Sequence, residues 1–139
     1  MSFTTRRPVL IEWGDCDAAQ IVFYPRYFAM FDAATQFLFA QALGYRKPAM
    51  IARFGIMGIP MVDTRAKFHA PCSFGDDVVI ESQAVRFGRS SFDVQHRLLR
   101  GDTLCVEAWE TRVWAAADPA DPRRIRGVPL PAEVIAALS

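Results

Sequence analysis

The sequence has almost no net charge, no long apolar run and no leader-like start, and each of these absences excludes a class of protein. Its 139 residues carry a net charge of +1 at pH 7, which provides no global attraction to nucleic acid or to a membrane surface. No apolar run approaches the roughly 18 residues of a transmembrane helix. Residues 1–13, MSFTTRRPVLIEW, lack the apolar core and the small-residue cleavage site of a signal peptide. We therefore expect a protein that binds neither nucleic acid nor membrane.

Cysteine is also scarce, with three residues at unrelated spacings: Cys16, Cys72 and Cys105. An odd number without a metal-binding spacing is typical of reduced thiols in the cytoplasm. We therefore expect a cytoplasmic protein with no metal site. We interpret Cys16 as a packing residue, because the carboxylates on either side of it disfavour a thiolate.

Apolar material, by contrast, is plentiful. Hydrophobic residues make up 52% of the chain and charged residues 22%, which is enough for a buried core. The length fits one domain, residues 1–139. The apolar fraction is slightly high for so short a chain, which favours subunits that bury part of it between them.

One long helix is predicted at residues 25–43. Pro25 suits the first turn of a helix and Gly44 suits its end. Thirteen of the 18 residues from 26 to 43 are apolar and lie on all sides, which is typical of a helix that is buried on most faces. After Arg26 in the first turn, Asp32 is the single charged side chain inside it.

A short loop with two carboxylates, Asp15 and Asp17, precedes this helix. A helix N-terminus presents unpaired N–H groups and a partial positive charge, which favour an ionised carboxylate nearby. One aspartate could then serve as a nucleophile or general base, while the N–H groups hold a developing oxyanion. The alternative is that both aspartates only cap the helix. Spacing alone leaves both interpretations open.

After residue 60 the apolar pattern has a period of two, which predicts strands joined by short turns. We expect strands at 7–13, 61–69, 78–87, 91–100 and 103–115, a short edge strand at 124–128, and short helices at 48–54 and 131–138. Consecutive strands joined in this way form an antiparallel meander. The long helix can be buried only against the concave face of that curved sheet. Because one sheet face does not cover all its sides, we also expect a homodimer.

Several segments resemble the hot-dog-fold acyl-CoA thioesterases of the 4-hydroxybenzoyl-CoA thioesterase type. The resemblance lies in IEWGDCD at 11–17, IVFYPRY at 21–27, DAA at 32–34, GIP at 58–60, FGDD at 74–77, RSSF at 89–92 and RIR at 124–126. Only the stretch from GDCD to YPRY is fairly specific. The resemblance implies an α+β hot-dog fold, in which a five- or six-stranded antiparallel sheet wraps around one long helix.

The resemblance also implies the reaction. The family's catalytic carboxylate corresponds to Asp17, which attacks the thioester carbon or activates a water to do so. The backbone N–H at Tyr24 polarises the thioester carbonyl. No metal or redox cofactor is implied, since coenzyme A is part of the substrate.

Further roles follow from the matching positions. In hydroxybenzoyl-type relatives the residue that matches Asp32 meets the ring hydroxyl; the alternatives are that Asp32 pairs with an arginine or faces a subunit interface. Tyr27, Thr64 and Ser91 are further substrate-binding candidates. The candidates for the coenzyme A phosphates are Arg89, Arg124 and Arg126. His69 and His96 are interpreted as structural residues, because a lone histidine on a strand usually is one.

Two departures from the family pattern stand out. The catalytic aspartate of the family is often followed by Pro-Ala-Gly, but Ala18, Ala19 and Gln20 follow here. The loop is therefore less stiff at residue 18 and has no glycine at residue 20. In the turn before Ser91, extra basic residues of the relatives are absent and Arg89 stands alone.

The function expected from the sequence is hydrolysis of an aromatic acyl-CoA to a carboxylic acid and free coenzyme A by a homodimer or a dimer of dimers (a homotetramer). The competing expectations are a thioesterase for short or branched aliphatic acyl-CoA, and a non-catalytic module that binds acyl-CoA or acyl carrier protein.

Overall fold

The computed structural model describes residues 2–139. Its elements in chain order are β1 Thr4–Leu10, the 3-10 turn η1 Trp13–Asp15, α1 Tyr24–Leu43, α2 Lys47–Phe54, β2 Met61–Phe68, β3 Asp77–Phe87, β4 Ser91–Arg100, β5 Thr103–Val113, β6 Ala115–Ala117, β7 Ile125–Gly127 and α3 Ala132–Leu138.

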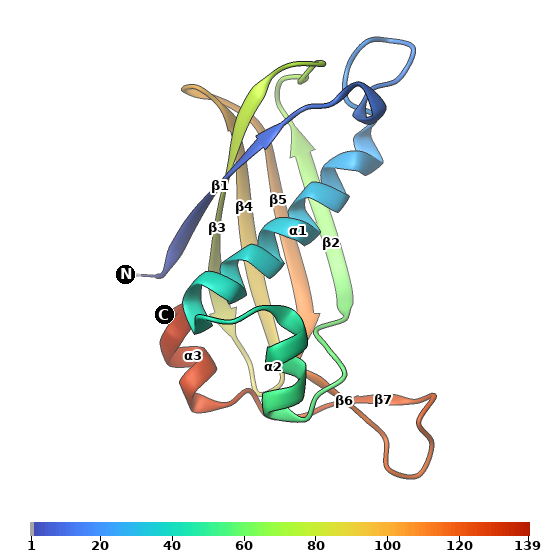
Figure 1. Ribbon diagram of the computed structural model, residues 1–139, viewed down its shortest axis with the longest axis vertical. Coiled ribbons are helices and arrows are strands. Elements are labelled where there is room, and N and C mark those ends of the chain that lie inside the picture. The colour runs from blue at the N-terminus through green and yellow to red at the C-terminus, as the bar shows by residue number, and fades with distance from the viewer. Residues whose placement is uncertain (1) are drawn as a thin grey trace.

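One antiparallel sheet with the strand order β1-β3-β4-β5-β2 forms the body of the molecule. Strands β3, β4 and β5 are the expected meander. Helix α1 lies diagonally across one face of this sheet (Figure 1). The five-stranded α+β arrangement around a long helix is the one expected from the sequence. A separate two-stranded ribbon, β6 and β7, projects from one end of the molecule.

Helix α1 begins and ends where its sequence predicts. Pro25 occupies the first turn, where its missing N–H costs nothing. Gly44 ends the helix in the left-handed conformation, with φ of 83°, which glycine adopts without strain. The short helices α2 and α3 contact α1 and cover its C-terminal half (Figure 1). Part of the cover expected from a second subunit is therefore supplied by the chain itself.

The first strand begins at Thr4 and not at residue 7, and two predicted strand ends are wrong because hydrogen bonds redirect the chain. The first strand ends at Leu10 and not at residue 13, because Asp15 Oδ2 accepts a hydrogen bond from the Glu12 N–H at 2.9 Å and closes a 3-10 turn. The last long strand stops at Val113. The next residue, Trp114, turns away and donates its N–H to Ser90 O at 2.7 Å, and β6 then pairs with β7 instead.

Strand β2 is the open edge of the sheet. It pairs with β5 on one side only, and seven of its eight residues are exposed. Three of these are apolar, with exposed fractions of 40% for Met61, 64% for Val62 and 51% for Phe68. The charged residues Asp63, Arg65 and Lys67 lie between them, so the edge is mixed in character, and its unpaired backbone groups remain available to another strand.

Candidate active site

The aspartate loop is folded back onto the segment that leads into α1. The Asp17 N–H donates to Ile21 O at 3.0 Å, and Cys16 forms a β-bridge with Val22. The Asp17 side chain is exposed, and its Oδ1 accepts a hydrogen bond from the Ala19 N–H at 2.9 Å. The backbone of Asp17 therefore lies opposite Ile21, three residues before the helix begins.

The two aspartates of the loop have different surroundings. Asp15 is half-buried; its side chain closes the 3-10 turn, and its carbonyl oxygen accepts the Phe23 N–H at 2.8 Å. The N-cap of α1 is Phe23, and no side chain caps it. The interpretation that Asp15 and Asp17 cap the long helix is therefore wrong, because each carboxylate binds a backbone N–H of its own turn.

Gln20 has the one left-handed backbone conformation among the non-glycine residues of 2–139, with φ of 68°. The bond from its N–H to Asp17 O at 2.9 Å holds the turn in this conformation. A side chain is disfavoured there, because its Cβ approaches the following carbonyl. This is the position at which the sequence lacks the glycine of the family pattern.

Replacing Gln20 with glycine should therefore stabilise the protein. We expect Gln20→Gly to raise the free energy of unfolding by about 0.5 kcal/mol, or roughly 2–4 °C in the thermal midpoint, because relief of the strain exceeds the added chain entropy. Ala19→Gly, one residue away at a φ that is not positive, is the matched control and should destabilise. Equal losses in both variants would contradict a strained turn. Differential scanning calorimetry measures both.

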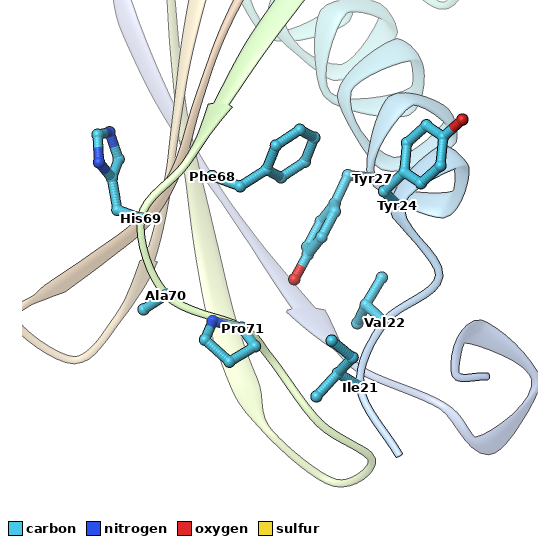
Figure 2. A pocket seen from close by; sticks show the side chains of 8 residues that line it. All are labelled: Ile21, Val22, Tyr24, Tyr27, Phe68, His69, Ala70 and Pro71. Carbon is cyan, nitrogen blue, oxygen red and sulfur yellow. The ribbon is translucent and has the colours of Figure 1, made fainter. Parts of the chain in front are cut away.

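The start of α1 borders an apolar cavity of about 340 Å³. It is lined by Ile21, Val22, Tyr24, Tyr27, Phe68, His69, Ala70 and Pro71 (Figure 2). Pro25 has no N–H, and within residues 2–139 the Tyr24 N–H donates to no protein acceptor. A helix end with a spare donor beside an apolar cavity suits a polar oxygen on an apolar ligand. The Asp17 side chain does not line this cavity.

Tyr27 is a buried aromatic residue of the cavity wall, with 4% of its surface exposed. Its hydroxyl accepts a hydrogen bond from the Cys72 N–H at 3.2 Å. Burial raises the pKa of Tyr27 above its ordinary range, so its phenol keeps its proton at neutral pH. Its ring lies against Phe68 of β2, with centroids 5.8 Å apart. Tyr27 can contact a ligand in the cavity with its ring.

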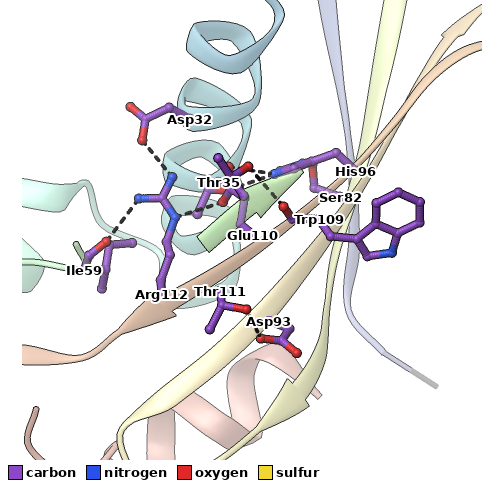
Figure 3. Close-up of polar contacts among 11 residues, drawn as sticks. Asp32, Thr35, Ile59, Ser82, Asp93, His96, Trp109, Glu110, Thr111 and Arg112 are labelled. Atoms are coloured by element: carbon purple, nitrogen blue, oxygen red, sulfur yellow. Dashed lines mark hydrogen bonds and ion pairs between the residues drawn. The ribbon is translucent and has the colours of Figure 1, made fainter. Parts of the chain in front are cut away.

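Asp32 pairs with an arginine, one of the alternatives left open by the sequence. Its Oδ1 accepts a hydrogen bond from Arg112 Nη2 at 2.7 Å (Figure 3). The Asp32 side chain remains 58% exposed, whereas the Arg112 side chain is 4% exposed. The contact therefore joins a buried cation on β5 to an accessible anion on α1.

A buried polar cluster lies behind this pair (Figure 3). Arg112 Nε donates to Glu110 Oε1 at 2.8 Å, and Thr35 Oγ1 donates to the same oxygen at 2.6 Å. His96 Nε2 lies 3.3 Å from Glu110 Oε2, and His96 Nδ1 lies 2.7 Å from Ser82 Oγ. Burial acts to raise the pKa of Glu110, but hydrogen bonds and charge from His96 and Arg112 outweigh it and lower the pKa to about 2. Glu110 is therefore ionised at neutral pH.

This cluster includes a serine, a histidine and a glutamate, but it is no hydrolytic triad. Ser82, His96 and Glu110 are 1%, 0% and 2% exposed, so a substrate does not reach them. His69 lies outside the cluster, exposed and within 2.9 Å of Glu107. Sequence reasoning missed Glu110 and Arg112. The available signal was two charges at inward-facing positions of a strand with a period of two.

The other predicted site residues fall into two groups. Thr64 lies on β2 opposite Glu110, and its Oγ1 donates to Trp109 O at 3.1 Å. Ser91 lies at the start of β4, where its Oγ accepts a hydrogen bond from Arg86 Nη2 at 3.0 Å. Thr64 thus belongs to the sheet edge beside α1, whereas Ser91 belongs to the end of the molecule that carries the arginines.

The three arginines lie at the opposite end from Asp17. Arg89 is in the turn between β3 and β4, and its carbonyl oxygen accepts the Leu130 N–H at 2.9 Å. Arg126 is on β7, and Arg124 directly precedes that strand in the ribbon. The start of β3 adjoins the aspartate loop, where the Ile11 N–H donates to Asp76 O. Strand β3 has 11 residues, so at about 3.3 Å per residue its two ends lie roughly 35 Å apart.

Two further observations concern residues 2–139 as a whole. No helix there is long and apolar enough to cross a membrane. The same residues contain no cluster of three or more histidine, cysteine or acidic side chains placed to hold a metal ion.

Comparison with known proteins places this geometry in a family. A model of the Thioesterase-like superfamily matches residues 11–138. Among curated proteins, 4-hydroxybenzoyl-CoA thioesterase from Pseudomonas sp. strain CBS-3 is 36% identical over 131 residues, which cover 90% of each chain. A 1,4-dihydroxy-2-naphthoyl-CoA hydrolase from Synechococcus elongatus is 32% identical over 64% of this chain and 65% of its own.

Solved structures give the same result. A crystal structure of an aspartate-to-asparagine variant of 4-hydroxybenzoyl-CoA thioesterase, in complex with 4-hydroxybenzoyl-CoA, matches with a TM-score of 0.90 and 31% identity. The match covers 99% of this chain and 100% of that one. A gentisyl-coenzyme A thioesterase matches with a TM-score of 0.80 and 27% identity, over 96% of this chain and 98% of that one.

Proposed function

Because the chain belongs to the Thioesterase-like superfamily, we propose that it hydrolyses the thioester bond of an aromatic acyl-CoA, releasing a carboxylic acid and free coenzyme A. The single observation that carries the proposal is the juxtaposition of a carboxylate loop, a helix start with a spare N–H and an apolar cavity of about 340 Å³. The aromatic acyl group is supported by the rings of Tyr24, Tyr27 and Phe68 at this cavity. The relatives whose names specify an acyl group act on aromatic ones.

The proposed chemistry uses two groups of the chain. Asp17, which is exposed and whose backbone pairs with Ile21 three residues before α1, attacks the thioester carbon or removes a proton from the water that does so. The carbonyl oxygen becomes negative in either case, and the Tyr24 N–H at the positive end of α1 stabilises it. The thiolate of coenzyme A then leaves. Where Asp17 is the nucleophile, this step leaves a mixed anhydride on its carboxylate, and water hydrolyses that anhydride to the free acid and restores Asp17. No residue of the buried Ser82, His96 and Glu110 cluster takes part, because the substrate does not reach it.

The site is proposed to be shared between two copies of the chain. Arg89, Arg124 and Arg126, the candidates for the coenzyme A phosphates, lie at the far end from Asp17, beyond the roughly 35 Å that β3 spans. Antiparallel pairing of the open edge strand β2 with its copy would bring the arginine end of one chain beside the aspartate end of the other. It would also cover the exposed Val62. The second chain would add a wall to the apolar cavity at the start of α1, which the Asp17 side chain of the same chain does not line.

This arrangement predicts the mass of the protein in solution. We expect sedimentation at twice the chain mass of 15.6 kDa, or at four times that mass if dimers pair. Val62→Asp should give a folded monomer with little turnover, because a charge would face the partner strand. Val85→Asp, at a residue of β3 that is 46% exposed and away from this edge, should leave the mass unchanged. A monomeric wild-type protein with full activity would contradict the shared site.

The acyl group is tested by turnover of a substrate panel followed by thiol release. We expect kcat/KM to be highest for 4-hydroxybenzoyl-CoA and benzoyl-CoA, lower for phenylacetyl-CoA, and lowest for butyryl-CoA, by about 10-fold or more, because butyryl cannot contact the ring-lined cavity as extensively. A preference for butyryl-CoA would favour an aliphatic thioesterase instead. Binding of all four esters without hydrolysis would favour a non-catalytic acyl-CoA-binding or acyl-carrier-protein-binding module.

We also propose that the enzyme acts in the cytoplasm. The three cysteines are free thiols, and burial raises the pKa of the Cys72 thiol to about 11, so that this thiol keeps its proton at neutral pH. Reduced cysteines support a cytoplasmic enzyme. The substrate supplies the only coenzyme that this mechanism uses.

A further inference from the structure

The guanidinium of Arg112 is held at three points inside the protein. Nε donates to Glu110 Oε1 at 2.8 Å, Nη1 donates to Ile59 O at 3.1 Å, and Nη2 donates to Asp32 Oδ1 at 2.7 Å (Figure 3). These partners lie on three segments: β5, the chain before β2, and α1. Since the planar group cannot satisfy all three in another orientation, its position is fixed.

The carboxylate of Asp32 is held on one side and open on the other. Within residues 2–139, Arg112 is the hydrogen-bond donor to Asp32, and it uses Oδ1. Oδ2 has no protein partner there, and the side chain is 58% exposed. An unheld aspartate at such a position would rotate, and ordering it around a ligand would cost entropy.

Asp32 lies further along α1 from the helix start, by a length that suits one aromatic acyl group. Asp32 follows Tyr24 by eight residues on α1, which is about 12 Å along the helix axis. This length is comparable to one aromatic acyl group with a hydrogen bond at each end. An acyl carbonyl at the Tyr24 N–H would therefore place a donor at the far side of the ring close to Asp32.

We propose that Arg112 is a positioning residue for the acyl group: by fixing Oδ1 of Asp32, it presents Oδ2 as an acceptor for a hydroxyl on the substrate ring. The inference rests on the proposed aromatic acyl-CoA substrate. Arg112 does not contact the substrate itself, because its side chain is 4% exposed. Its contribution is to order the acceptor before the substrate arrives, as preorganised sites do.

The test is the preference for a ring hydroxyl, measured as the ratio of kcat/KM for 4-hydroxybenzoyl-CoA to kcat/KM for benzoyl-CoA. We expect Asp32→Ala to lower this ratio about tenfold. Arg112→Lys, which keeps the charge but not the planar fork, should lower it by a similar factor. The double variant should show no further fall, since the two residues act through one acceptor. Arg97→Lys, which alters a partly exposed pair with Glu81 on a neighbouring strand, is the matched control and should leave the ratio unchanged.

A purely structural role for Arg112 gives a different result. Arg112→Lys would then lower kcat/KM for both esters equally, the ratio would stay at its wild-type value, and the inference would be overturned. Where Arg112→Lys does not fold, Asp32→Glu replaces it, because the added methylene moves the carboxylate out of register with Arg112. We expect Asp32→Glu to lower the ratio as Asp32→Ala does, whereas a retained ratio would overturn the inference.

A binding measurement separates this inference from the proposed function. Calorimetric titration of wild type and variants with 4-hydroxybenzoate and with benzoate gives the two dissociation constants. Their ratio measures the preference for a ring hydroxyl without turnover. Absence of hydrolysis with selective binding of 4-hydroxybenzoate would reject the proposed function and keep the positioning role. If the protein hydrolyses the esters, but wild type and Arg112→Lys each bind 4-hydroxybenzoate and benzoate equally, the proposed function is kept and the positioning role is rejected.

Discussion

Asp17→Asn should lower kcat by about a hundredfold or more while acyl-CoA binding is kept. Asparagine has the same shape, and its side-chain oxygen can still accept the Ala19 N–H that holds the turn, so the loop keeps its conformation. It lacks the negative charge that a nucleophile or a general base requires. Single-turnover kinetics with 4-hydroxybenzoyl-CoA and calorimetric binding measure the two quantities separately.

Asp15→Asn is the matched control for this experiment. Asp15 lies two residues earlier in the same loop, and its carboxylate accepts the Glu12 N–H, a bond that an asparagine oxygen can also accept. Its turnover should therefore stay within a few-fold of wild type. If Asp15→Asn lost as much turnover as Asp17→Asn, general disturbance of the loop would explain both losses and Asp17 would have no assigned role. Full activity in Asp17→Asn would reject the mechanism.

Glu110→Gln should cost about 3 kcal/mol of unfolding free energy, or roughly 10 °C in the thermal midpoint. The change removes the charge of the buried anion that Arg112 contacts. The Arg112 side chain is 4% exposed, and its other anionic partner, Asp32, is 58% exposed. Breaking a buried ion pair is costly because the remaining charge stays desolvated. Glu107→Gln on the same strand is the control, since its pair with His69 is partly exposed and should contribute less than 1 kcal/mol. Equal losses would contradict the buried pair.

The same pair gives the protein an acid-dependent stability. The pKa of Glu110 is lowered to about 2 in the folded protein from an ordinary 4.5, so its stabilisation is present above pH 4.5 and is lost as the pH falls towards 2. The difference in unfolding free energy between wild type and Glu110→Gln should therefore shrink over that interval. A difference that stays constant from pH 6 to pH 3 would contradict this assignment. Urea unfolding at several pH values measures it.

The sequence predicted the elements because their signals are local. Pro25 and Gly44 bracket the long helix, and the alternation after residue 60 marks the strands. One error was local as well: the bond from the Glu12 N–H to Asp15 converts the end of a predicted strand into a turn, and apolar periodicity does not register a single side-chain hydrogen bond. The early end of β5 came from a distant contact, because the Trp114 N–H donates to Ser90 O.

These local patterns could not predict contacts between segments that are far apart in the sequence. Asp32 and Arg112 are 80 residues apart, and nothing near Asp32 in the sequence names its partner. The two charges at inward-facing positions of β5 were a visible irregularity, since a strand facing a core rarely carries them unless they are paired. The roles of Asp17 and of the arginines were predicted from family resemblance, and they stay predictions until turnover is measured.

The distance between the two ends of β3 has a consequence for mixtures of damaged chains. A chain with Asp17→Asn keeps its three arginines, and a chain in which Arg89, Arg124 and Arg126 are replaced keeps its aspartate loop. If the site is shared as proposed, a dimer with one chain of each kind would contain one complete site, whereas a dimer of two identical variants would contain none. The rate of hydrolysis in the mixture would then be proportional to the fraction of mixed dimers, and two inactive variants would complement each other.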